Sequence, residues 1–166
     1  RFIVEQGLNE QWDGDERQLG LIVQGGLYNA LIRALQELGL ADTDGNTRIP
    51  ILALNVVYPL VPEQLEAFCQ DKQAVLVLEE GQPEFIEQEI ATHLRRRGLT
   101  TALHGKDVLP MGGEYSAEVV LAGLSKFLTR HAPQWVKHET PLVTQALAEV
   151  RTQVAQILQV PVPPRP

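Results

Sequence analysis

The chain has 166 residues, enough for one domain with a sizeable core, and its 44% hydrophobic and 21% charged residues are typical of a soluble globular protein. Its formal net charge of −7 argues against binding to nucleic acid or an anionic membrane, because both require a basic patch, and no apolar run is long enough to cross a bilayer. The single cysteine, Cys69, excludes an internal disulfide and a four-cysteine metal or cluster site, and nothing near Arg1 resembles a signal peptide, so we expect a reducing, cytoplasmic setting.

The N-terminal part of the chain leads into a strand and a helix. Residues 1–18 are polar after a short apolar run, and we interpret them as a linker arm or an edge strand near its start. Residues 19–24 form an apolar run with β-branched members, which predicts a buried strand. The pair Gly25-Gly26 predicts a sharp turn, and from Leu27 the apolar residues recur every three or four positions, as in a helix. This order is the first half of a βαβ unit.

The middle of the chain continues this alternation. Further strands are predicted at residues 50–57, 74–78 and 99–103. A helix is expected to begin at Pro62 and another at Pro83, since proline suits the first turn of a helix. Strands that alternate with helices at short spacing predict an α/β fold, with three αβα layers around a mainly parallel sheet.

The C-terminal part is expected to be helical and then extended. Ser116 is the expected N-cap of a helix over residues 117–130. A last helix is expected from Thr140, and the tail has the composition of a polyproline-like linker. We assign residues 19–131 to the α/β domain and residues 132–166 to a C-terminal helix and proline-rich linker.

The two ends of the chain also bear on its organisation. The chain begins at Arg1, its single methionine is Met111, and it ends on a run rich in proline. We therefore expect it to be a piece of a longer polypeptide, whose function this sequence carries only in part.

The glycine pair Gly25-Gly26 is the first candidate for chemistry. A glycine turn between a strand and a helix can bring backbone amides to a phosphate at the helix N-terminus. The sequence around it lacks the third glycine of a dinucleotide fingerprint and the lysine of a P-loop. We therefore favour a tight turn packed against a neighbour, and keep a nucleotide or small-ligand site at this turn as the alternative.

The acidic pair Glu79-Glu80 follows a predicted buried strand, at the end where α/β folds place their ligands. Paired carboxylates there can bind a metal, act as acid and base, or cap a helix and pair across a domain interface. No histidine or second acidic cluster stands at ligand spacing, so we favour capping or an interface. Glu80 directly precedes the next helix, and we expect the positive end of that helix dipole to be its partner.

The other reactive residues give no catalytic pattern. The histidines show no pairing by spacing, and Cys69 is expected in the core because it lies on the inner face of its helix. Lys106 and Glu114 fall in the loops after the last predicted strand, where they are either polar contacts or plain surface. The residues alone therefore predict no catalytic centre; the histidines are His93, His104, His131 and His138.

Several stretches taken together resemble a known family. They are the strand and glycine turn at residues 19–28, and residues 57–60, 75–80, 83–88 and 105–114, which occur in a recognisable order. The set is similar to the transketolase C-terminal-like domain in the α subunit of indolepyruvate:ferredoxin oxidoreductase, one of the thiamine-dependent 2-oxoacid:ferredoxin oxidoreductases. The resemblance covers about residues 19–128.

The resemblance implies a parent enzyme that decarboxylates an aryl 2-oxoacid on thiamine diphosphate with Mg²⁺. Such an enzyme passes the electrons through iron-sulfur clusters to ferredoxin and uses coenzyme A as acyl acceptor. In this family the cofactor is held by other domains, so the resemblance implies no catalytic, cofactor-binding or metal-binding residue in this chain. It implies instead that loops of this domain face neighbouring domains, and the expected contact residues are Gly25, Gly26, Tyr58, Glu79, Glu80, Lys106 and Glu114.

The chain also departs from the family pattern. Gln24 stands where the family often has a small hydroxyl residue, which argues against an anion contact at the first glycine turn. No cysteine-rich segment is present, so any iron-sulfur cluster of the parent is expected outside this chain. Our leading interpretation is a non-catalytic structural domain, and the alternatives are a stand-alone ligand-binding module and an interaction domain that forms a homodimer through a sheet edge or its last helix.

Overall fold

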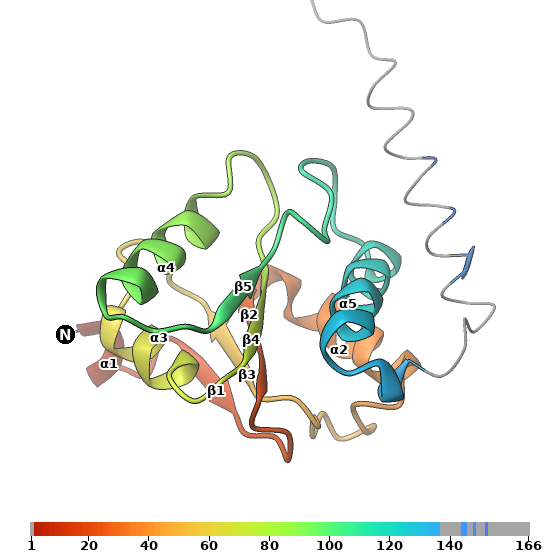
Figure 1. Ribbon diagram of the computed structural model, residues 1–166, viewed down its shortest axis with the longest axis horizontal. Helices are drawn as coiled ribbons and strands as arrows, with labels where there is room; N and C mark the ends of the chain where they lie inside the picture. The colour runs from red at the N-terminus through yellow and green to blue at the C-terminus, as the bar shows by residue number, and fades with distance from the viewer. Residues whose placement is uncertain (1, 137–143, 146–147, 149–151, 153–166) are drawn as a thin grey trace, which may run out of the picture.

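Figure 1 shows a computed structural model of the chain, which describes residues 2–136, 144–145, 148 and 152. The helix expected from Thr140 and the proline-rich tail lie outside the described residues, apart from those isolated positions. Within the described part, no helix is both long and apolar enough to cross a membrane.

Within residues 2–136 the strands form one sheet, in the order β1-β3-β2-β4-β5. Each neighbouring pair among β3, β2, β4 and β5 is parallel, and β1 pairs antiparallel with β3 at the edge. The prediction of a mainly parallel sheet is therefore confirmed. The strands are β1 (Glu10–Trp12), β2 (Leu19–Gln24), β3 (Ile51–Leu54), β4 (Ala74–Leu78) and β5 (Ala102–His104).

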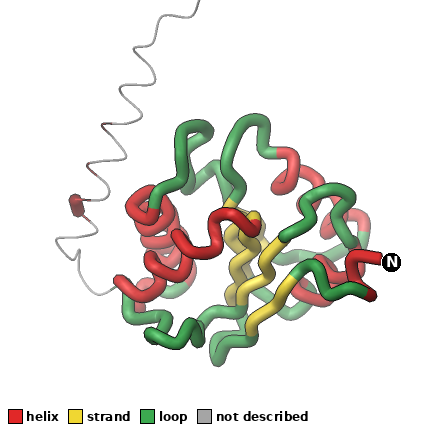
Figure 2. The backbone as a smooth tube through the Cα atoms, turned by 180° about the vertical axis from the view of Figure 1, so that it is seen from behind, coloured by secondary structure: helices red, strands yellow, loops and turns green. Residues whose placement is uncertain are grey.

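Helices cover both faces of the sheet, as the predicted αβα layers require (Figure 2). One face packs against α2 (Tyr28–Glu37) and α5 (Ala117–His131), and the other against α3 (Pro62–Cys69) and α4 (Phe85–Arg96). Because successive strand residues point to opposite faces, Leu21 packs in the first layer and its neighbour Ile22 in the second.

The local signals for helix ends match the structure. The Ser116 hydroxyl accepts a hydrogen bond from the Val119 amide and caps α5, and Pro62 is the first residue of α3. Gly39 follows α2 with a φ of 68°, a left-handed conformation that glycine adopts without a steric cost. These residues mark where the helices that cover the sheet begin or end.

Several predicted boundaries are wrong. The edge strand lies at β1 rather than at the start of the chain, where Phe2–Glu5 forms the short helix α1. The strand expected over residues 50–57 stops at Leu54, and beyond it the Val56 amide donates to the side-chain oxygen of Asn9 at 3.1 Å instead of to a neighbouring strand. The last strand begins at Ala102 rather than at residue 99, after the Thr101 hydroxyl has bonded to the Cys69 carbonyl oxygen.

The starts of two helices also differ from the prediction. The turn Gly25–Leu27 is a 3₁₀ helix (η1) that precedes α2, so the α-helix begins at Tyr28. The helix expected from Pro83 begins at Phe85. In both places the chain uses an extra turn to move from the edge of the sheet onto its face.

The layered core gives a first testable expectation. Replacing the fully buried Leu21 by alanine should lower the free energy of unfolding by about 2–5 kcal/mol, because the surrounding layers cannot close the cavity. Urea unfolding followed by circular dichroism measures this. Val4→Ala is the control, since that valine is 50% exposed, and it should change the value by less than about 0.5 kcal/mol. Equal losses in the two variants would contradict this description of the core.

Candidate functional site

The carboxyl ends of the parallel strands meet at one edge of the sheet, and we call this the carboxyl edge. The segments that leave it are η1 after β2, residues 55–61 after β3, residues 79–84 after β4 and residues 105–115 after β5. In Figure 1 the long loops after β4 and β5 rise side by side from this edge. Every contact residue expected from the sequence lies in one of these segments.

Glu79 is the buried acid of this edge, with 6% of its surface exposed. Its carboxylate accepts hydrogen bonds from the backbone amides of Ile86 at 3.0 Å and Glu87 at 3.1 Å, in the first turn of α4. A carboxylate at a helix N-terminus satisfies amides that have no partner within the helix and is favoured by the helix dipole. The capping interpretation therefore holds for Glu79, and the prediction that Glu80 is the partner of this dipole is wrong.

Glu80 has a different role, which is to connect neighbouring segments. Its carboxylate accepts a hydrogen bond from the Tyr115 amide at 2.6 Å. Its own amide donates to the side-chain oxygen of Gln24 at 3.3 Å. Glu80 thereby links the ends of β2 and β4 to the loop that leads into α5.

Lys106 lies between these acids. Its Nζ donates to the Glu79 carbonyl oxygen at 2.6 Å and to the Tyr115 hydroxyl at 2.8 Å, and its amide donates to a Glu87 carboxylate oxygen at 3.0 Å. The Tyr115 hydroxyl in turn donates to the Pro110 carbonyl oxygen. These bonds hold the loop after β5 against the start of α4.

Burial shifts the pKa values of two of these groups. Partial burial lowers the pKa of Lys106 from its ordinary value, and the nearby Glu79 and Glu87 carboxylates oppose this shift. Burial, together with the same carboxylates and Glu80, raises the pKa of Tyr115, so its hydroxyl stays protonated and can donate. The edge is thus a network of a cation, carboxylates and a neutral phenol whose bonds are made within the domain.

The hydrogen bonds of this network join the loops after β4 and β5 to one another and to the start of α4. Among the described residues, no group of three or more His, Cys, Asp or Glu side chains could hold a metal ion. Cys69, the last residue of α3, is buried, and burial raises the pKa of its thiol to about 12, which suits the expected core role and not a nucleophile.

Apolar side chains are exposed beside the network. Tyr58 is 84% exposed and Phe85 is 66% exposed. With Val57 and Ile86 they line an open groove of about 800 Å³ along α4. Met111, on the loop after β5, is a further exposed apolar side chain, at 43%. We call Tyr58 and Phe85 the edge aromatics.

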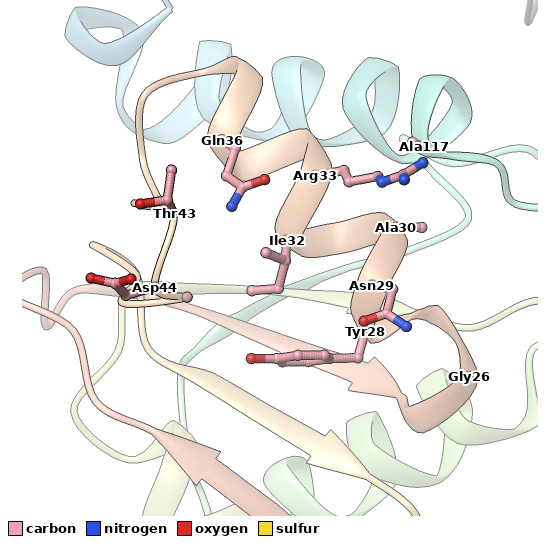
Figure 3. Close-up of a pocket in the computed structure, with 11 residues that line it drawn as sticks. Gly26, Tyr28, Asn29, Ala30, Ile32, Arg33, Gln36, Thr43, Asp44 and Ala117 are labelled. Atoms are coloured by element: carbon pink, nitrogen blue, oxygen red, sulfur yellow. The ribbon is translucent and has the colours of Figure 1, made fainter.

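A second, more polar groove of about 720 Å³ follows α2 (Figure 3). Tyr28, Ile32 and Gln36 lie along the side of α2 that faces the loop with Thr43 and Asp44. On the other side of the helix, Arg33 points toward Ala117 at the start of α5 (Figure 3). The Tyr28 ring is stacked on Trp12 of β1, with ring centroids 4.6 Å apart.

The two glycines of the pair have different surroundings: Gly25 packs against the end of β3, and Gly26 faces the groove along α2. A Cβ atom on Gly25 would lie 2.3 Å from the side-chain oxygen of Asn55, so this glycine allows a close approach to the end of β3. A Cβ on Gly26 would meet nothing within 4 Å, and Gly26 lines the groove along α2. The packing interpretation therefore fits Gly25, while Gly26 has open space beside it.

Sequence reasoning placed some of these residues at the edge and missed others. The structure joins Glu79, Glu80 and Lys106 through Tyr115, which the sequence did not single out. Tyr58 and Glu114 are exposed at the same edge and make no part of this network. The only sequence signal for Tyr115 is its position as an aromatic residue between the glycines of the loop and the helix cap Ser116.

The histidines show no pairing by spacing in the sequence, but the fold brings two of them together. The Nε2 atoms of His104 and His131 lie 2.9 Å apart, at the ends of β5 and α5. The two residues are 27 positions apart in sequence, so no spacing rule for a single element could find the pair.

The Glu79 cap gives a second testable expectation. Glu79→Gln keeps an oxygen acceptor but removes the charge, and should lower the free energy of unfolding by about 1–3 kcal/mol, because charge-assisted bonds to the α4 amides are lost. Chemical unfolding of the 166-residue chain measures it. Glu114→Gln at the exposed end of the same edge is the matched control and should leave stability unchanged. An unchanged free energy of unfolding in Glu79→Gln would show that α4 does not depend on this cap.

Comparison with known proteins gives one family. Residues 9–107 match the family described as the indolepyruvate ferredoxin oxidoreductase middle domain. A protein of Thermococcus kodakarensis named indolepyruvate oxidoreductase subunit IorA is 30% identical over 152 residues, which cover 92% of this chain and 21% of the relative. A protein of the same name from Methanothermobacter marburgensis is 34% identical over 120 residues, covering 71% of this chain and 18% of the relative.

A solved structure shares the fold. A split-gene transketolase, whose structure is described as an inactive tetramer (written beta4), superimposes with a TM-score of 0.52 at 18% identity. The match covers 74% of this chain and 42% of that chain. The resemblance to a transketolase-like domain is thereby confirmed at the level of the fold. The chain spans about a fifth of the length of the curated relatives it matches. It belongs to the family of indolepyruvate ferredoxin oxidoreductase middle domains.

Proposed function

We propose that this domain is a non-catalytic assembly domain of a thiamine diphosphate-dependent enzyme. That enzyme would oxidatively decarboxylate indolepyruvate or related aryl 2-oxoacids, with ferredoxin as electron acceptor. The family and the names of the relatives, which are indolepyruvate oxidoreductase subunits, support the reaction. The short share of those relatives that the chain covers supports a role as one part of a larger enzyme.

The observation that carries the proposal is that the polar residues of the carboxyl edge are bonded within the domain while the aromatic residues beside them are exposed. Glu79, Glu80 and Lys106 are bonded to backbone and side-chain groups of the domain itself. The edge aromatics beside them are both exposed and line the same groove. A surface with a rigid polar frame and exposed aromatic side chains is suited to docking, because aromatic residues carry much of the binding energy at protein interfaces.

The residues at this edge do not fit a thiamine diphosphate site. A diphosphate with Mg²⁺ needs free oxygen ligands for the metal and donors for the phosphates. Here the Glu79 carboxylate is occupied by α4 amides, and the ammonium of Lys106 is bonded to Glu79 and Tyr115. The proposal therefore assigns thiamine diphosphate, Mg²⁺ and the iron-sulfur clusters to other parts of the enzyme.

The same proposal specifies the partners. The edge aromatics and the loops after β4 and β5 would face other domains or subunits of the enzyme. Ferredoxin would meet the enzyme where the clusters lie, and no contact with nucleic acid or a membrane is proposed. A homodimer of this domain is the rival mode of assembly, and sedimentation of the 166-residue chain would detect it as a doubled mass.

A second candidate function rests on the groove along α2. Gly26 and Asn29 line it at the start of the helix and Arg33 lines it near the middle, and their donors could bind a nucleotide or another small anionic ligand. This candidate would make the domain a ligand-binding module in its own right.

A binding experiment separates the two candidates. We expect isothermal titration of the 166-residue chain with thiamine diphosphate and Mg²⁺, and with a nucleoside triphosphate, to give no binding heat. Tight binding of thiamine diphosphate would overturn the assembly role. Nucleotide binding that is lost in Gly26→Val, while the circular dichroism spectrum is unchanged, would establish the second candidate instead.

The docking role makes a separate expectation about the edge aromatics. Changing both Tyr58 and Phe85 to serine in the complete enzyme should weaken association of the parts that meet at this edge roughly 10-fold or more, as loss of an aromatic hot spot does. Size-exclusion chromatography and 2-oxoacid-dependent ferredoxin reduction would report it.

Arg95→Ala, at the opposite end of α4 from Phe85, is the matched control and should assemble normally. Thermal melting of the 166-residue chain should be unchanged by the serine variants, because both aromatics are exposed. Normal assembly of the double variant would contradict the docking role.

A further inference from the structure

His104 and His131 form a compact cluster with groups from β5, α5 and the loop after β5. Their Nε2 atoms are 2.9 Å apart, and their ring centroids are 4.9 Å apart. The Phe127 ring packs against both, at 5.7 Å from His104 and 5.2 Å from His131. The pair therefore connects the C-terminal turn of α5 to the carboxyl end of β5.

Asp107 fixes the arrangement of protons on this pair. Its carboxylate lies 2.8 Å from His104 Nδ1 and can only accept, so that nitrogen carries a hydrogen. When His104 is neutral, its Nε2 is then a lone pair that accepts from His131 Nε2. When His104 is protonated, its Nε2 donates, and a neutral His131 can accept by changing tautomer. With both rings protonated, two N–H donors would face each other at hydrogen-bond distance.

The charges around the pair do not favour double protonation. From α5 the Arg130 guanidinium bonds to the Asp107 carboxylate and approaches His104 Nδ1 at 3.5 Å. From the loop, Lys106 is directed to Glu79 and Tyr115. Burial first, and then the positive charge of His104 and Arg130, hold the pKa of His131 below its ordinary value, against the opposing effect of Asp107.

We propose that the His104–His131 pair is a proton-sensitive latch, which holds the loop after β5 onto the end of α5 while at most one ring is protonated and releases it when both are. The anchor continues into the loop, because Asp107 also accepts a hydrogen bond from the Gly105 amide and the Leu109 amide donates to the Gly105 carbonyl oxygen. Release would loosen the segment that carries Lys106. Its effect on docking rests on the proposed function, but the latch itself does not.

The sign of the pH dependence follows from the lowered pKa of His131. The unfolded chain binds a proton at this residue more readily than the folded chain does. The stabilising contribution is therefore complete above the unfolded value of about 6.5 and is lost as pH falls below it toward the folded value.

Histidine resonances of the 166-residue chain provide the direct test. In a titration followed by NMR, we expect His131 to become protonated below the range of an ordinary imidazole, because its pKa is lowered in the folded chain. The Gly105, Leu109 and Ala132 amides should exchange faster once both rings are protonated, after correction for intrinsic exchange. Ordinary protonation of His131, with no change in exchange, would overturn the latch.

A variant tests the same point through stability. His131→Gln keeps a side-chain donor for His104 Nε2 but takes up no proton. From about pH 7.5 to about pH 5, the melting temperature of the unmodified chain should fall roughly 2–4 °C more than that of this variant. His93→Gln on α4 is the control and should follow the unmodified chain. Equal falls for the unmodified chain and His131→Gln would overturn the latch, and if His131→Gln fails to fold, the NMR titration of the unmodified chain decides.

Discussion

The burial of β2 and β4 on both faces is the constraint from which the rest of this structure follows. All five residues of β4 are buried, and β2 is buried from Leu19 to Val23, so each strand needs a helical layer above and below it. Parallel strands are joined by helices that cross from the end of one strand to the start of the next, and these helices form the layers. The carboxyl ends of the strands then gather at one edge, which is where the polar residues of the chain meet.

Because the strand ends meet there, this edge contains a buried carboxylate together with the donors that satisfy it. A buried carboxylate such as Glu79 is costly unless hydrogen-bond donors surround it, and the first turn of α4 supplies them. The Lys106 ammonium adds a positive charge from the neighbouring loop, and Tyr115 joins that loop to Glu80. The network joins the loops at this edge through hydrogen bonds and leaves the edge aromatics outside it. The proposed docking role rests on that exposed aromatic surface.

The parts of the fold that depend on local physics could be predicted from the sequence. Continuous apolar runs located β2 and β4, and the cap at Ser116 and the proline at Pro62 located the starts of α5 and α3. The predicted boundaries were wrong where a residue far away in the sequence takes a backbone hydrogen bond, as after Leu54, where the Val56 amide donates to the side chain of Asn9. The carboxyl edge could be located because parallel strands end together, but the pairing within it could not. Whether Glu79 or Glu80 caps α4 depends on which side chain points inward, and the His104–His131 contact depends on how α5 lies across β5.

A structure of the complete enzyme with thiamine diphosphate bound tests the central claim most directly. The assembly role predicts that Tyr58 and Phe85 are buried against a neighbouring domain or subunit and that the cofactor touches other domains alone. A cofactor diphosphate seated at the Gly25-Gly26 turn, or edge aromatics left open to solvent in the assembled enzyme, would contradict it.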